Sequence, residues 1–223
     1  MPIPKITVKV AIVLPAFNES AVIYKVLKSL PKSIQKMGSP QVIVIDDGSQ
    51  DSTFRLATKA NVDVIRHPIN RGVGAATKTG IELAKKKNAD IVVTFDADGQ
   101  HHPQDIEKVV SPILNNKADL VIGSRFLSSQ KIPLDRFILN WLANFATFFL
   151  FGVFSTDSQS GFKAFSKKAL KLIDFKSDRM EFCSEILLEA KKNKLKIVEV
   201  PIRSIYTKYS RKKGQKNLNA LPI

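Results

Sequence analysis

Residues 90–100 read DIVVTFDADGQ, an apolar and β-branched run that ends in two aspartates and a glutamine. Such a run, closed by turn-forming residues, is typical of a buried β-strand. The first 125 residues repeat this pattern, and apolar residues recur at helical spacing between the runs. Strands that alternate with helices predict an α/β fold, with a mostly parallel central sheet and helices on both faces. The expected strands are 6–14, 41–46, 62–66, 90–96 and 118–122.

The loops that follow these strands are rich in polar and charged residues. In open α/β sheets, ligands bind beyond the carboxyl ends of the strands. We therefore expect a functional site at this edge of the sheet. The loops that should carry it are 15–19, 46–51, 67–74, 96–102 and 123–125.

The composition is that of a globular protein with a large excess of positive charge. The chain has 223 residues, of which 44% are hydrophobic and 25% charged, so we expect one domain over residues 1–223. Lys and Arg number 35 against 20 Asp and Glu, a net charge of +15. This excess predicts an anionic partner: nucleic acid, an acidic membrane face or a phosphorylated substrate.

The strongest chemical signal is the acidic loop after the fourth expected strand. Asp96 and Asp98 can point the same way because alternate residues leave a strand on one side, and Gln100 lies two residues further on. Carboxylate and amide oxygens are ligands that suit Mg²⁺ or Mn²⁺, and substrate phosphates can fill the remaining positions. The alternative is a solvated, Asp-rich turn.

Three other loops carry weaker signals. Asp46, in the second acidic loop, can accept hydrogen bonds from a ribose or a base, although helix capping is an alternative. The loop 71–74 (RGVG) precedes a helix and could contact a phosphate, or its small residues could serve packing. Arg125 and Arg136 can bind phosphate oxygens, or they can be ordinary surface arginines.

Residues 137–154 (FILNWLANFATFFLFGVF) form the most apolar stretch. Its 18 residues are at the lower limit for a membrane span, and Asn140, Asn144 and Thr147 interrupt it. Two interpretations stay open. A helix with its aromatic residues on one side could lie in a membrane interface, or the segment could be a core helix that covers the sheet.

Seven stretches, in the same order along the chain, resemble family 2 glycosyltransferases of the GT-A fold. Within that family they are most similar to dolichyl-phosphate mannose synthases and polyprenyl-phosphate glucosyltransferases. The stretches cover nearly the whole chain: LPAFNE (14–19), VIDDGSQDST (44–53), NRGVGAA (70–76), DADGQHHP (96–103), GSR (123–125), DSQSGFKAFS (157–166) and EVPIRSIY (199–206).

The resemblance implies a role for each matching residue. Asp98, Arg125 and Arg136 would be catalytic, with Asp98 and Gln100 on the metal, Asp96 a further metal ligand, and both arginines on the acceptor phosphate. Residues 1–125 would form the nucleotide-sugar half, and residues 126–223 the acceptor and membrane-facing half with a basic tail. The implied nucleotide-sugar-binding residues are Pro15, Phe17, Glu19, Val44, Asp46, Asp96, Ala97, Asp98, Lys208 and Ser210.

The resemblance also implies a reaction. A sugar would pass with inversion from GDP-mannose, or from UDP-glucose or another UDP-sugar, to dolichyl or polyprenyl monophosphate, with Mg²⁺ or Mn²⁺ as cofactor. The enzyme would sit peripherally on the cytoplasmic face of a membrane.

Two alternatives belong to other chemistries. A sugar hydroxyl acceptor needs a general base, for which Asp157 and Glu181 are candidates. A nucleic-acid-binding module could use the basic tail 191–216. The sequence holds no recognised nucleic-acid motif, so no nucleic-acid partner is expected.

Overall fold

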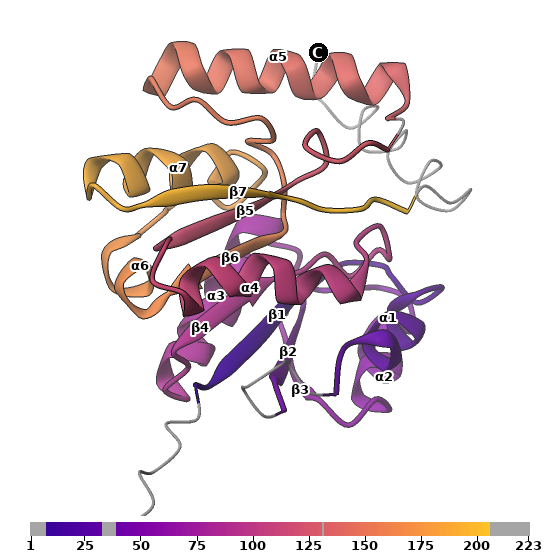
Figure 1. The fold of residues 1–223 in the computed structure, drawn as a ribbon. Coiled ribbons are helices and arrows are strands. Elements are labelled where there is room, and N and C mark those ends of the chain that lie inside the picture. Colours follow the sequence, from indigo (N-terminus) through magenta and orange to yellow (C-terminus); the bar gives the residue numbers. More distant parts are fainter. Residues whose placement is uncertain (1–7, 33–38, 131, 206–223) are drawn as a thin grey trace, which may run out of the picture.

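The computed structural model describes residues 8–32, 39–130 and 132–205 (Figure 1). Lys208 and Ser210 therefore lie outside the described residues. A seven-stranded sheet has the order β3-β2-β1-β4-β6-β5-β7, and β6 runs antiparallel to its neighbours while the other pairs are parallel. The strands are β1 (Val10–Ala16), β2 (Gln41–Asp46), β3 (Asp63–Arg66), β4 (Ile91–Thr94), β5 (Leu120–Ser124), β6 (Lys163–Ser166) and β7 (Ile197–Pro201).

Helices cover both faces of this sheet, which confirms the predicted α/β architecture. The helices are α1 (Ile23–Ser29), α2 (Thr53–Thr58), α3 (Val73–Lys86), α4 (Ile106–Leu114), α5 (Leu134–Phe151), α6 (Lys167–Leu172) and α7 (Phe182–Lys192), with a short 3₁₀ helix, η1 (Pro103–Asp105), before α4.

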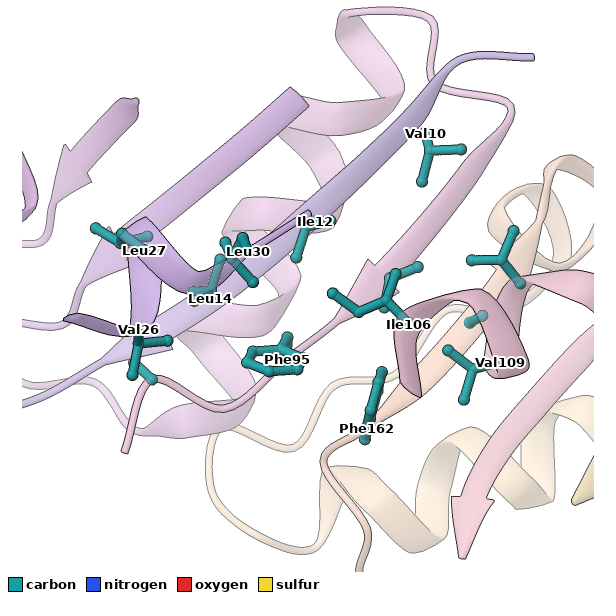
Figure 2. Packing of buried hydrophobic residues seen from close by; sticks show 14 of the residues in the cluster. Val10, Ile12, Leu14, Val26, Leu27, Leu30, Phe95, Ile106, Val109 and Phe162 are labelled. Atoms are coloured by element: carbon teal, nitrogen blue, oxygen red, sulfur yellow. The ribbon is translucent and has the colours of Figure 1, made fainter. Parts of the chain in front are cut away.

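Alternate residues of β1 divide the core into two layers. Ile12 and Leu14 pack against α1 and α4, as Figure 2 shows with Ile106 of α4. Ala11 and Val13 point to the other face, which α3, α6 and α7 cover. This alternation is the period-two pattern of a strand that is buried on both sides.

The strand β6 was not predicted from the sequence, because its four residues follow a polar stretch and are too short to show a pattern. It pairs with β4 on one side and with β5 on the other. Strands from both parts of the chain, 1–125 and 126–223, therefore share one sheet. The segment that joins the neighbours β5 and β6 contains α5.

Helix α5 lies apart from the layers that cover the sheet (Figure 1). Trp141, Phe145 and Phe149 form a row on its outer side, with ring centroids 5.9 and 6.3 Å apart, and each side chain is more than half exposed. The interpretation of this segment as a core helix is therefore wrong. Among the residues the structure describes, no helix is both long and apolar enough to span a membrane.

Candidate active site

The loop after β4 brings an ordered acidic pair to the edge of the sheet. Asp96 is held by His101, whose Nε2 lies 2.7 Å from Oδ2 of Asp96. Burial alone would raise the pKa of Asp96, but the interactions with His101, and with Arg125 and Lys163 nearby, lower it below its ordinary value. Asp96 is therefore a carboxylate at neutral pH.

His101 anchors this loop to the rest of the fold through its side chain and its backbone. Its side chain is buried, and the ring packs against Phe95 and Phe162 with centroids 5.5 and 5.0 Å away. Its backbone forms a β-bridge with Ser204, directly after β7. The loop that carries both aspartates is therefore anchored on two sides.

Asp98 and Gln100 lie together, as the metal prediction requires. The backbone N–H of Gln100 donates to Oδ1 of Asp98 at 2.9 Å, and the side-chain nitrogen Nε2 of Gln100 donates to Oδ2 at 2.6 Å. Rotating the side-chain amide of Gln100 by half a turn would put its oxygen where Nε2 now lies, beside Asp98. A carboxylate and an amide oxygen together suit a hard divalent cation. No group of three or more His, Cys, Asp and Glu that could hold a metal ion occurs within residues 8–32, 39–130 and 132–205.

The chain just before β6 comes close to Asp96. A Cβ on Gly161 would lie 2.4 Å from Oδ1 of Asp96, so only glycine leaves room for this carboxylate. Thr94 of β4 holds Gly161 in this position, because its hydroxyl donates to the carbonyl of Gly161 at 2.6 Å. Lys163, two residues on, is completely buried, and its ammonium donates to the carbonyl of Ser160.

Arg125, after β5, is locked to Asp157. Its Nε donates to Oδ2 of Asp157 at 2.7 Å and its Nη2 to Oδ1 at 2.6 Å, and its backbone N–H adds a third bond at 3.0 Å. The Asp157 side chain is completely buried, whereas that of Arg125 is 20% exposed. The arginine is thus fixed in place with part of its surface open to solvent.

Arg136 is brought near Arg125 by the inner side of α5. Nη2 of Arg125 donates to Oδ1 of Asn140 at 3.3 Å, and Nδ2 of Asn140 donates to the carbonyl of Arg136 at 2.9 Å. Residues four apart lie on one face of a helix, so Arg136 lies on the same side of α5 as Asn140. The structure thus places the two predicted phosphate-binding arginines on neighbouring elements.

The two aspartates after β2 have different surroundings. Asp46 is fully buried and pairs with Arg66, whose Nε lies 3.1 Å from Oδ2 of Asp46. Asp47 is structural: it accepts a 2.7 Å hydrogen bond from His67 and one each from the N–H groups of Arg71 and Gly72. A role of Asp46 in nucleotide binding stays a prediction, and Ser52, the N-cap of α2, makes no side-chain capping bond.

The loop 71–74 serves packing rather than phosphate binding in this structure. The N–H groups of Gly74 and Ala75, at the start of α3, both donate to the carbonyl of Asp178. Gly72 has φ +106°, and a Cβ there would lie 2.3 Å from the same carbonyl oxygen. These donors are therefore used inside the protein.

The other predicted nucleotide-sugar residues differ in their position. Pro15 is the second-last residue of β1, and Phe17, directly after the strand, is 38% exposed. Glu19 and Ala97 are buried. The prediction for Val44 is corrected by its position. Val44 lies inside β2 and is fully buried in the core, because the strand continues for two more residues. Its assignment to nucleotide-sugar binding has no support in the structure.

The hydroxyl-acceptor alternative loses its first candidate base. Both oxygens of Asp157 accept hydrogen bonds from Arg125, and no surface of Asp157 is exposed. A carboxylate that is fully buried and bound through both oxygens cannot reach a substrate hydroxyl. Glu181, the second candidate, is exposed at the start of α7.

Several side chains that build the site were missed as such by sequence reasoning: His101, Gly161, Lys163, Asn140 and Asn144. Two signals could have found some of them. Gly161 stands beside an acidic loop in three dimensions but 63 residues after Asp98 in the chain, so only strand pairing reveals it. The asparagines recur at i and i+4 in an otherwise apolar helix, which marks a polar stripe.

Known proteins are similar to this chain in sequence and in fold. A UDP-N-acetylglucosamine–dolichyl-phosphate N-acetylglucosaminyltransferase from Methanococcus voltae is 42% identical, over 91% of this chain and 88% of the relative. A polyprenol monophosphomannose synthase from Mycolicibacterium smegmatis is 31% identical, over 88% of this chain and 77% of the relative. Among solved structures, glucosyl-3-phosphoglycerate synthase from Mycobacterium tuberculosis, in complex with Mn²⁺, UDP-glucose and phosphoglyceric acid, superposes with a TM-score of 0.68 at 23% identity. That match covers 92% of this chain and 74% of the other.

The family follows from a direct match as well. The model of glycosyl transferase family 2 matches residues 11–173, which include the acidic loops, Arg125, Asp157 and Gly161. The resemblance seen in the seven motifs is thereby confirmed. The chain belongs to glycosyl transferase family 2, with the GT-A fold.

Proposed function

We propose that this glycosyltransferase moves a sugar from a nucleoside diphosphate to a polyprenyl monophosphate at a membrane surface. The observation that carries the proposal is the Arg125–Asp157 pair beside the acidic loop of β4, next to an aromatic face on α5. The two curated relatives described above are named for transfer to dolichyl phosphate and for polyprenol monophosphomannose synthesis.

The proposed acceptor chemistry needs no general base. The second pKa of a phosphate monoester is about 6, so the acceptor is largely ionised at pH 7 and needs no proton removed. Arg125 and Arg136 would bind its oxygens and offset their repulsion from the donor diphosphate. Asp157 would orient Arg125 rather than take a proton.

The acidic pair would hold the donor. Asp98 with Gln100, and Asp96 beside them, would hold Mg²⁺ or Mn²⁺ against the diphosphate. The cation would supply positive charge to the leaving nucleotide. Asp96 is suited to this place because it stays ionised, and Gly161 keeps its carboxylate uncovered by a side chain.

The donor itself is proposed from the relatives. The higher identity of the N-acetylglucosaminyltransferase makes UDP-N-acetylglucosamine the first donor to test. GDP-mannose, the first choice from the sequence motifs, is the second, in line with the polyprenol monophosphomannose synthase.

Membrane attachment would use the outer face of α5. This helix turns its polar residues Asn140, Asn144 and Thr147 inward and its aromatic row outward, the reverse of a helix that packs on a core. An exposed row of aromatic side chains suits the interface of a bilayer. Lys191 caps the end of α5 through the carbonyls of Phe151 and Gly152, so it places a cation beside this face for anionic lipid.

The test of the reaction is a panel of radiolabelled nucleotide sugars with a short-chain polyprenyl phosphate, with and without EDTA. We expect transfer from one donor into the lipid product, and loss of transfer under EDTA that added Mn²⁺ or Mg²⁺ restores. Full transfer under chelation would contradict the metal assignment. Transfer to a sugar hydroxyl but not to the phosphate would contradict the acceptor.

The test of membrane attachment is co-sedimentation with liposomes that contain anionic lipid. Replacing Phe145 and Phe149 by serine should move the protein to the supernatant. Ile69→Ser, on a residue that is 70% exposed far from α5 in the sequence, is the matched control and should leave sedimentation unchanged. Equal sedimentation of the double variant and the control would show that α5 does not hold the membrane.

A further inference from the structure

The amide of Asn144 binds the backbone on both sides of Asp157. Its Nδ2 donates to the carbonyl of Thr156 at 2.7 Å, and its Oδ1 accepts from the N–H of Ser158 at 2.8 Å. Only a side chain with one donor and one acceptor in this geometry can make both bonds. Asn144 therefore fixes the peptide groups that flank Asp157.

Asp157 passes this constraint to Arg125. The carboxylate holds Arg125 through its Nε, its Nη2 and its backbone N–H, at 2.6–3.0 Å. Asn140, one turn before Asn144 on α5, contacts the same guanidinium. The stripe of α5 thus reaches Arg125 by two routes, one direct and one through Asp157.

The opposite side of this loop is fixed to the sheet. Glu199 of β7 accepts hydrogen bonds from the hydroxyls of Ser155 and Thr156 at 2.6 Å each, and from the N–H of Thr156. The hydroxyl of Thr156 also lies 2.7 Å from that of Ser124, next to Arg125. The loop is therefore held between β7, which belongs to the core, and α5, which does not.

We propose that Asn144 is a positioning residue of the acceptor site: it sets Asp157, and through it the orientation of Arg125. The proposal rests on the proposed function for the part that concerns the acceptor phosphate. It gives a reason for an amide in the middle of an apolar helix. It also means that the orientation of Arg125 depends on the position of α5 relative to the sheet.

The experiment compares Asn144→Leu, which keeps the approximate volume of the side chain and removes both bonds, with the wild-type chain. The first readout is the NMR signal of the Arg125 Nε–H group, identified by its loss in Arg125→Lys. We expect this signal to shift and to exchange faster with water in Asn144→Leu. The second readout is steady-state kinetics, in which kcat/KM for the acceptor should fall by about tenfold for two lost hydrogen bonds while KM for the donor stays within about twofold.

Asn193→Leu is the matched control, because Asn193 also makes two side-chain hydrogen bonds, to the carbonyls of Leu172 and Glu189, at the end of α7. It should leave both readouts unchanged. If Asn144→Leu does not fold, as judged by circular dichroism, Asn144→Ala replaces it.

An unchanged Arg125 signal in a folded Asn144 variant would overturn the proposal, and so would an equal loss of donor and acceptor parameters. If the wild-type chain transfers no sugar to any polyprenyl phosphate, the proposed function fails. The NMR comparison still decides the role of Asn144 in that case.

Discussion

Replacing Asp157 by asparagine separates the two acceptor chemistries. The variant keeps the shape of the side chain but turns one acceptor oxygen into a donor, which then faces a donor of Arg125. A hydrogen bond between charged groups contributes about 1.5–3 kcal/mol. Since about 1.4 kcal/mol corresponds to a factor of ten, kcat/KM for the acceptor should fall about 10- to 100-fold.

The stability of the fold should also change. Asp157 is completely buried, and breaking a buried ion pair costs about 3–5 kcal/mol. We expect a loss near the lower end of this range, because asparagine retains one acceptor for Arg125. Urea unfolding measures this term, so the kinetic comparison is made at a temperature where the variant is fully folded.

The assay is the pH dependence of kcat/KM with a short-chain polyprenyl phosphate, with and without sodium azide. If Asp157 only orients Arg125, the variant keeps the shape of the wild-type profile, and azide has no effect. If Asp157 were a general base, the acid limb of the profile would disappear, and azide, a small external base, would restore part of the rate. Such a rescue would refute the reasoning from the Arg125–Asp157 geometry.

Three further predictions concern the edge of the sheet. Asp98→Ala should lower kcat by about 10²–10³-fold, the usual effect of losing one electrostatic contact at a reacting centre. Titration with Mn²⁺ should show weaker metal binding in this variant, and unchanged binding would contradict the assignment of Asp98 as a metal ligand. Gly161→Ala should displace the carboxylate of Asp96, 2.4 Å from the new Cβ, and reduce donor binding measured by calorimetry, whereas wild-type affinity would show that the loop yields freely. Asp105 is buried, and burial would raise its pKa, but its bonds with Lys108 and others lower it below the ordinary value. Its stabilisation is therefore present above about pH 4 and is lost as the pH falls through the lowered value, so Asp105→Asn should cost about 2 kcal/mol in urea unfolding at pH 6 and less at pH 3; an equal cost at both pH values would contradict this.

The first part of the fold could be predicted because its strands are buried on both faces. Continuous β-branched runs such as residues 41–46 and 90–94 leave little ambiguity, and their polar ends mark the edge of the sheet. The acidic pair was found for the same reason. A local pattern cannot give the pairing of distant segments, so β6, which follows Gly161 by two residues, was not predicted.

The sequence also could not show which side chains bind each other. The sequence marks Asp157 and Arg125 as separate candidates for two different reactions, and only their distance of 2.6 Å shows that each is the partner of the other. The loop 71–74 has the composition of a phosphate-binding turn, but the carbonyl of Asp178 satisfies its donors. The tail that would carry Lys208 and Ser210 lies outside the described residues, so their role stays a prediction.

The connection between β5 and β6 makes the acceptor side a separable insert. These strands are neighbours in the sheet, with Ile122 paired to Lys163, so the ends of the intervening segment meet about 5 Å apart. A tight turn could close the same gap. Arg125, Asp157 and the whole of α5 therefore form one excursion between two neighbouring strands, which Glu199 of β7 also holds to the sheet. If this excursion holds the acceptor as proposed, a graft of another segment at these two strand ends should change what receives the sugar.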